Sequence, residues 1–151
     1  MNRIGELCER DVIVGTPEMT VADAAQLMRQ QHVGCIVIVD RTSGGLGIPR
    51  GIVTDRDIVV EIIATGLDPA VMTLGDIMPD ELVTIHAEDG PVEAMRLMRV
   101  KGVRRLPVIT QSGHLIGIVA FDDLLQVVND ELSDLTKTVG REQAREASAR
   151  R

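Results

Sequence analysis

GIVTDRDI at residues 51–58 and GIVAFDDL at residues 117–124 are near-copies of one octet. In each copy a short apolar run is followed directly by a polar turn and an aspartate, Asp57 or Asp123. This order predicts a buried strand that ends where a helix begins. The second octet is either scaffolding or the second half of a binding site, and the rest of the chain bears on that choice.

The repetition extends well beyond the octets. A shift of 70 positions aligns RIGELC at residues 3–8 with TLGDIM at residues 73–78, and it pairs Met28 with Met98. After Asp40 the shift becomes 66, because the Gly-rich segment RTSGGLGIPR is four residues longer than its counterpart QSGHLI. Exposed turns tolerate such length differences. The chain is therefore a duplication of one unit.

The first half of each unit is predicted to be a short strand followed by a helix. Thr20 precedes an apolar-periodic run and has an acidic residue three positions later, as in a capping box, and Asp89 is the expected cap of the second helix. The two helices are expected to end near Gly34 and Gly102. The expected strands, one in each unit, cover residues 12–14 and 82–85.

The second half of each unit is predicted to be two strands and a closing helix. The strands are CIVIV or LPVI and then GIV, and the helices begin near Asp57 or Asp122. DIVVEIIATG is ambiguous because it is rich in β-branched residues, but its counterpart DDLLQVVNDELSDL is helical, so the repeat assigns a helix to both. Each unit thus has the order β-α-β-β-α, in the α+β class. Neither unit can bury its sheet alone, so the two are expected to pack together.

The composition favours a globular chain with an aliphatic core. Of 151 residues 44% are hydrophobic, yet Phe121 is the only aromatic residue, which disfavours base stacking on single-stranded nucleic acid. A net charge of −7 also disfavours general nucleic-acid binding, since phosphates repel an acidic surface. The tail at residues 141–151, with four arginines and two glutamates, is expected to be a frayed helix or disordered; the alternative is a basic contact surface.

Targeting, redox and catalytic signals are weak. The N-terminal MNRIGELCERD has no apolar central region, and the longest apolar runs are too short to cross a bilayer, so a cytoplasmic location without a membrane partner is expected. Cys8 and Cys35 show neither a disulfide framework nor metal-ligand spacing, and the histidines are dispersed. No nucleophile elbow or triad order is present, which disfavours an enzyme.

The duplicated openings, the segments VGCIVIVD and VRRLPVI and above all the two octets resemble a tandem pair of cystathionine-β-synthase (CBS) domains, often called a Bateman module. The resemblance covers residues 3–137 and divides them into repeats at 3–66 and 73–137, followed by a charged tail at 138–151. It implies two repeats packed with pseudo-two-fold symmetry, in a stand-alone pair of bacterial type that dimerises as a flat disc. It also implies a sensing role without a catalytic cofactor. The family's ligands are AMP, ADP, ATP, NAD, S-adenosylmethionine and cyclic dinucleotides.

The resemblance places the ligand at the octets, where the family motif is G-h-h-[ST]-x-x-D. Thr54 and Asp57 match it fully, and imply contacts with phosphate or ribose and with the ribose hydroxyls. In the second octet Asp123 matches, but Ala120 stands in place of the hydroxyl residue. A carboxylate suits the ribose hydroxyls and a helix N-terminus suits phosphate. The alternative is that Thr54 and Asp57 form only a capping box, and the two roles are compatible.

Basic residues form the second constellation. The resemblance directs Arg104 and Arg105 at phosphate, with Arg56 as a further candidate, and guanidinium groups suit that task. If both lie on one strand, only one of the pair can face a cleft, and the alternative is that both are surface charges. The hydroxyl lies in one repeat and the arginines in the other, so either the sites differ or one ligand spans both. Thr16 and His86, in openings that fit the family only loosely, are expected cleft contacts.

Together these features predict a regulatory homodimer that senses an adenine nucleotide, AMP, ADP or ATP, between its repeats and acts on an unknown protein partner. The alternative is a ligand-free interaction scaffold that kept the fold and lost the pocket, an interpretation that Ala120 favours. A role in DNA binding would require the basic tail.

Overall fold

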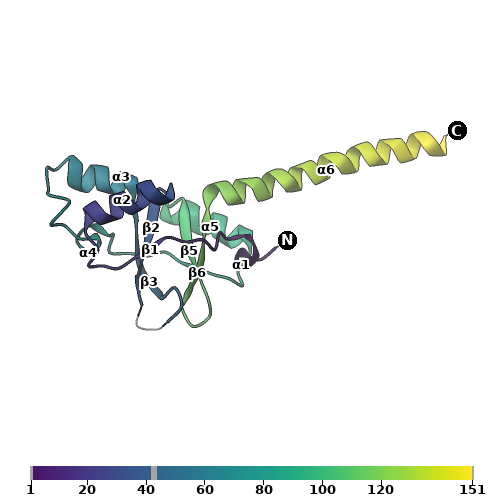
Figure 1. The fold of residues 1–151 in the computed structure, drawn as a ribbon. Helices are drawn as coiled ribbons and strands as arrows, with labels where there is room; N and C mark the ends of the chain where they lie inside the picture. The colour runs from purple at the N-terminus through teal and green to yellow at the C-terminus, as the bar shows by residue number, and fades with distance from the viewer. Residues whose placement is uncertain (1, 42–43, 151) are drawn as a thin grey trace.

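The computed structural model describes residues 2–41 and 44–150; residues 42–43 of the Gly-rich turn lie outside that part. Two three-stranded sheets lie side by side at its centre (Figure 1). Each sheet pairs a short strand in parallel with a longer one, which then forms an antiparallel hairpin. The strands are β1 (Val14–Gly15), β2 (Cys35–Asp40), β3 (Ile48–Thr54), β4 (Ile85–His86), β5 (Arg105–Ile109) and β6 (Leu115–Ala120).

The helices complete the order β-α-β-β-α in both halves, which confirms the predicted α+β fold of two repeats. The β-branched segment that propensity left ambiguous is helical, although five of its residues form a π-helix. Among the described residues, no helix combines the length and apolar character that crossing a membrane requires. The helices are α1 (Ile4–Leu7), α2 (Val21–Gln31), α3 (Asp55–Ile58), the π-helix η1 (Val59–Ile63), α4 (Leu74–Ile77), α5 (Pro91–Lys101) and α6 (Phe121–Ala149).

Three local predictions need correction. β1 begins two residues and β4 three residues after the predicted strands, and each ends one residue later than predicted. Helix α2 ends at Gln31, not near Gly34, because His32 takes the left-handed conformation with φ 55° and caps it. Asp89 does not cap α5: Gly90 is the N-cap, and the Asp89 carboxylate instead accepts a hydrogen bond from His86 N–H at 3.2 Å. The α2 cap is confirmed, since Thr20 Oγ1 accepts from an α2 backbone N–H.

The opening segment of each half packs against the other half. Ile4 of α1 is fully buried in the core of the second repeat, and its N–H donates to the Asp89 carbonyl at 2.8 Å. Leu74 of α4 is fully buried in the core of the first repeat, and its N–H donates to the Met19 carbonyl at 2.9 Å. The two halves therefore exchange equivalent segments, which gives them a pseudo-two-fold relationship and joins them.

This exchange explains why both octets begin with glycine. A Cβ on Gly117 would stand 2.6 Å from Cys8 Sγ, and one on Gly51 would stand 2.9 Å from Met78 Sδ. Cys8 and Met78 end the two equivalent openings, so each opening crosses the other repeat's octet where its glycine leaves room. A further apolar cluster lies between the repeats and includes Val37 of β2.

Helix α6 continues past the second repeat as a single helix to Ala149. It leaves the body of the molecule and extends away from both sheets (Figure 1). Of the two expectations for the tail, helix or disorder, the structure has the helix.

Candidate functional site

The first octet ends β3 and begins α3 with a capping box that is closed on both sides. Thr54 N–H donates to Asp57 Oδ2 at 2.8 Å, and Asp57 N–H donates to Thr54 Oγ1 at 3.2 Å. Both side chains are half-buried. The capping-box geometry predicted from the sequence is therefore confirmed. The carboxylate is fixed through Oδ2, and a carboxylate has further lone pairs with which to accept hydrogen bonds.

The second octet repeats this geometry without the hydroxyl. Ala120 N–H donates to Asp123 Oδ2 at 2.8 Å, and α6 begins at the next residue. The backbone of Ala120, with φ −104° and ψ 160°, closely matches that of Thr54, with φ −105° and ψ 163°. Because an alanine side chain cannot accept a hydrogen bond, the Asp123 N–H lacks the partner that Asp57 has. Asp123 is thus held in the same orientation by half of a cap.

Arg104 and Arg105 lie where the second octet ends. Arg105 begins β5 and pairs with Ala120 across the hairpin, whereas Arg104 precedes the strand and is exposed. The Arg104 guanidinium lies 4.8 Å from the centre of the Phe121 ring and 3.9 Å from Asp122 Oδ1. This cation–π contact and long ion pair hold it over the start of α6. A small cavity of about 50 Å³ is lined by these two arginines together with Ala120, Phe121 and Asp122.

Arg105 also acts across the boundary between the repeats. Burial raises the pKa of the Cys35 thiol, the charge of Arg105 opposes that rise, and Asp55 adds to it. Cys35 begins β2 and pairs with Thr54 across the first hairpin. The guanidinium of the second repeat is therefore within electrostatic reach of the first octet. The Asp55 carboxylate lies near Gly34, 3.3 Å from where a Cβ on Gly34 would stand. The residue before β2 and the residue after β3 therefore lie together at the open end of this hairpin.

The exchanged opening supplies residues beside the second octet. Burial raises the pKa of the Cys8 thiol, Arg10 lowers it, and Asp123 is among the charges that raise it. Cys8 and Arg10 were not predicted as site residues, because the order of the sequence assigns them to the first repeat. The only signal that could have pointed to them is the glycine at the start of each octet, which marks a close approach of another segment.

Thr16 is not brought to the cap of its own repeat. It follows β1, which pairs with β2 through Gly15 and Ile38. Thr54 pairs with Cys35 at the opposite end of β2. At roughly 3.3 Å per residue this places Thr16 on the order of 13 Å further along the sheet. The expected cleft contact at Thr16 therefore has no support from the sheet register.

His86 occupies the equivalent place in the second repeat. It is exposed and pairs with Ile109 of β5, whereas Ala120 pairs with Arg105 at the other end of that strand. Arg56 is exposed within α3, next to the Thr54–Asp57 cap. The structure thus brings Arg56 beside the predicted site and leaves His86 away from it.

The chain belongs to the CBS domain family, which it matches over residues 4–64 and 74–130. An uncharacterised protein of Methanopyrus kandleri is 40% identical over 124 residues, covering 82% of this chain and 61% of that protein. A hexameric CBS-CP12 protein from bloom-forming cyanobacteria has a similar structure, with a TM-score of 0.71 and 32% identity over 82% of this chain and 66% of that one. The chain thus spans less than two thirds of either relative.

A third similar structure contains a ligand. It is a CBS domain protein from Pyrobaculum aerophilum complexed with AMP, with a TM-score of 0.71 and 25% identity over 80% of this chain and 88% of that one. Within residues 2–41 and 44–150 of the present chain, no three His, Cys, Asp or Glu side chains are grouped as a metal ion would require.

Proposed function

We propose that the protein is a non-catalytic regulatory module that senses an adenosine-containing nucleotide, AMP, ADP or ATP, in the cleft between its two repeats. The observation that carries the proposal is that the closed Thr54–Asp57 cap of one repeat lies next to Cys35, which pairs with Thr54 and whose thiol is influenced by Arg105 of the other repeat. The structure of the Pyrobaculum relative with AMP supports the choice of ligand.

Asp57 is suited to the ribose. Its Oδ2 is already fixed by the Thr54 N–H, so little side-chain entropy remains to be lost when a ligand binds. A half-buried carboxylate can then accept hydrogen bonds from ribose hydroxyls, and its charge strengthens them. Asp123 is held in the same way and offers the same chemistry in the second repeat.

Arg105, Arg104 and Arg56 are suited to the phosphates. A guanidinium is permanently charged, and its forked N–H groups match phosphate oxygens. Arg105 is half-buried at the boundary of the repeats, whereas Arg104 has Phe121 and Asp122 as present partners and would exchange the long ion pair for a phosphate. A nucleotide with its ribose at Asp57 and its phosphate toward Arg105 would bridge the two repeats.

Such a bridge would act by a population shift. The repeats are joined by their exchanged openings and by the apolar cluster around Val37, so they form a connected pair whose relative orientation a bridging ligand can bias. The ligand must bind one orientation more tightly than the other to have this effect. The changed orientation would then be passed to a protein partner.

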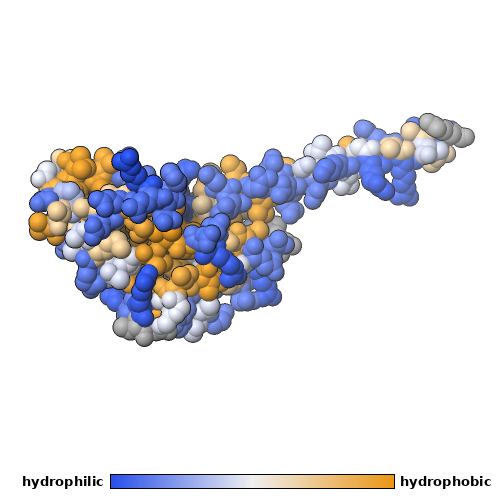
Figure 2. All heavy atoms as spheres, viewed as in Figure 1, coloured by the Kyte–Doolittle hydropathy of each residue, from blue (hydrophilic) through white to orange (hydrophobic). Residues whose placement is uncertain are grey.

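The proposal includes a homodimer. Val59, Val60 and Ile63 of η1 and Leu125 of α6 are exposed apolar residues on the helices that flank the sheets. Figure 2 shows apolar surface gathered over the end of the molecule that carries α3. Burying such a surface favours self-association, and the hexameric relative shows that proteins of this family assemble.

A ligand-free scaffold is the second candidate, and one observation favours it. The cavity beside the arginines measures about 50 Å³, whereas small-molecule sites are typically about 300 Å³ or more. A nucleotide phosphate therefore requires this cavity to widen. Thermal unfolding of the protein with and without AMP, ADP or ATP tests the choice: the sensor melts at a higher temperature with at least one of them, and the scaffold melts at the same temperature with all.

A further inference from the structure

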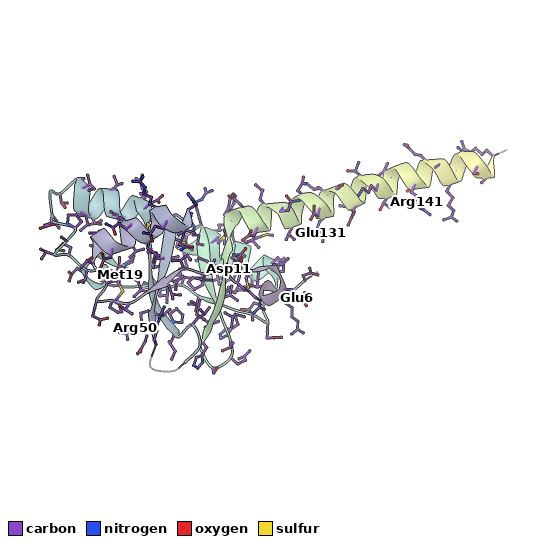
Figure 3. All side chains as sticks on the ribbon, viewed as in Figure 1. Glu6, Asp11, Met19, Arg50, Glu131 and Arg141 are labelled. Carbon is purple, nitrogen blue, oxygen red and sulfur yellow. The ribbon has the colours of Figure 1, made fainter. Side chains whose placement is uncertain are left out.

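Helix α6 carries a line of exposed apolar side chains beyond the second repeat. Leu132 is 59% exposed and Leu135 is 66% exposed, although both side chains are apolar. In the sequence both follow Glu131 and precede Arg141. Figure 3 labels Glu131 and Arg141 on the part of α6 that extends beyond the body of the molecule. Exposed apolar residues that form a continuous line usually mark an interaction surface.

The spacing of these residues is that of a coiled coil. Six exposed apolar residues of α6 follow one another at intervals of four, three, four, three and four. The mean interval of about 3.5 residues keeps a line of side chains straight along a partner helix, whereas a helix that packs on a globular core follows 3.6. We call these residues the α6 seam; they are Phe121, Leu125, Val128, Leu132, Leu135 and Val139.

We infer that the α6 seam pairs in parallel with the α6 seam of a second copy of this chain. In a parallel pair the residues just beside the seam face each other across the interface. In the exposed part of the seam those flanking positions are Asn129, Glu131, Thr136 and Thr138, so Glu131 of one helix faces Thr136 of its partner. No like charges oppose each other, and the seam is therefore compatible with itself.

The other charged residues of the same stretch lie on the far side of the helix from the seam. Asp130, Asp134 and Lys137 occupy positions away from the seam. A partner protein of strong charge would find few complementary groups beside the seam, whereas a second copy brings a matching apolar line. This contrast favours a second copy over a different protein.

The seam is continuous with an apolar groove at the base of α6. A cavity of about 360 Å³ lies between α5 and α6, and its lining includes Met95 and Met98 together with Phe121 and Leu125 of the seam. A two-fold axis along paired α6 helices would cover the groove and the seam together, since equivalent residues meet across such an axis. The inference thus rests on the homodimer proposed above. It adds that the two chains run in the same direction, with the second repeat of one chain next to the second repeat of the other. It does not require nucleotide binding.

Disulfide cross-linking tests the pairing. In a parallel pair Leu135 meets Leu135 of the second copy, so the Leu135→Cys protein should form a covalent dimer on mild oxidation. Lys137→Cys lies two positions away on the outer side and is the matched control, and the unsubstituted chain reports on Cys8 and Cys35. The inference is overturned if Leu135→Cys forms dimers no faster than Lys137→Cys. It is also overturned if disulfides form only between Leu125→Cys and Leu135→Cys chains, which would show an antiparallel pair.

Sedimentation equilibrium gives a second measurement that does not depend on cysteine. Leu132→Glu combined with Leu135→Glu lowers the net charge by two, and Lys137→Glu alone lowers it by the same amount. The double variant should raise the dimer dissociation constant by about tenfold or more, a change of about 1.4 kcal/mol or more, while Lys137→Glu should leave it near that of the unsubstituted protein. Equal dissociation constants would reject the seam. Nucleotide-dependent melting, measured on the same samples, separates a failure of the seam from a failure of the sensor proposal.

Discussion

Arg105 of the second repeat acts electrostatically on the thiol of Cys35 in the first repeat, and each of these residues begins the central strand of its own sheet. The two strand starts are therefore near enough for charge at one to act on the other across the boundary between the repeats. The Thr54–Asp57 cap lies beside the first of these strand starts, because Thr54 pairs with Cys35. A ligand held there would contact both repeats.

The first prediction follows from this electrostatic contact. Burial raises the pKa of the Cys35 thiol and Arg105 lowers it, so Arg105→Gln should raise that pKa further. Asp55→Asn should lower it, because Asp55 opposes Arg105. Since the thiolate is the reactive form, a thiol reagent at mildly alkaline pH should modify Cys35 more slowly in Arg105→Gln and faster in Asp55→Asn. The pH dependence of the modification rate, measured in a Cys8→Ser background, checks both signs.

Arg56→Gln is the control for that measurement, because Arg56 is not among the causes of the shift. If Cys35 reacted faster in Arg105→Gln than in the parent protein, Arg105 would not face Cys35. The proposal that one nucleotide contacts both repeats would then lose its supporting observation.

The second prediction concerns the glycines at which the openings cross the octets. Gly117→Ala should destabilise the fold by roughly 1–3 kcal/mol, because its Cβ would meet Cys8 Sγ at 2.6 Å and the Glu9 carbonyl at 2.8 Å. Gly51→Ala should cost less, because the flexible Met78 side chain can move. Gly140→Ala, in the open part of α6, should instead stabilise the helix, by up to about 1 kcal/mol. Urea unfolding gives all three values, and equal costs at the three glycines would contradict the exchange.

The third prediction concerns the incomplete cap. Ala120 has nearly the same backbone conformation as Thr54, so Ala120→Thr should supply the missing acceptor for the Asp123 N–H. The expected gain is about 0.5–2 kcal/mol of unfolding free energy, and Thr54→Ala should lose a similar amount. Chemical denaturation of the two variants checks the pair. A loss of stability in Ala120→Thr would show that the second site has closed around the smaller residue.

Much of the fold was predictable from the sequence because the same structural unit occurs in it twice. The helical counterpart of DIVVEIIATG assigned a helix to a β-branched segment, and Thr20 marked the start of α2. The exchange of α1 and α4 was not predictable, since the order of the chain does not say against which sheet a short amphipathic segment packs. His32 as a left-handed cap was missed because glycine is the usual residue there.

The candidate site was only partly predictable. Thr54 and Asp57 could be paired from their spacing, because a capping box is a local structure. The approach of Arg105 to Cys35 depends on how two sheets pack, which local pattern does not encode. Thr16 was expected in the cleft, but the strand register places it at the end of the sheet opposite the Thr54–Asp57 cap.

The measurement that tests the sensor proposal most directly is the nucleotide-dependent melting temperature of Asp57→Asn against that of Asp76→Asn. In both variants an amide oxygen can still accept the N–H of the N-cap residue, Thr54 before α3 or Thr73 before α4, so each keeps its helix cap. Only Asp57→Asn removes the charge expected at the ribose. We predict that AMP, ADP or ATP at about 100 times its dissociation constant stabilises the unsubstituted protein and Asp76→Asn by about 2.7 kcal/mol and stabilises Asp57→Asn much less. An equal rise in all three proteins would place the ligand elsewhere, and no rise in any would leave the scaffold as the function of this fold.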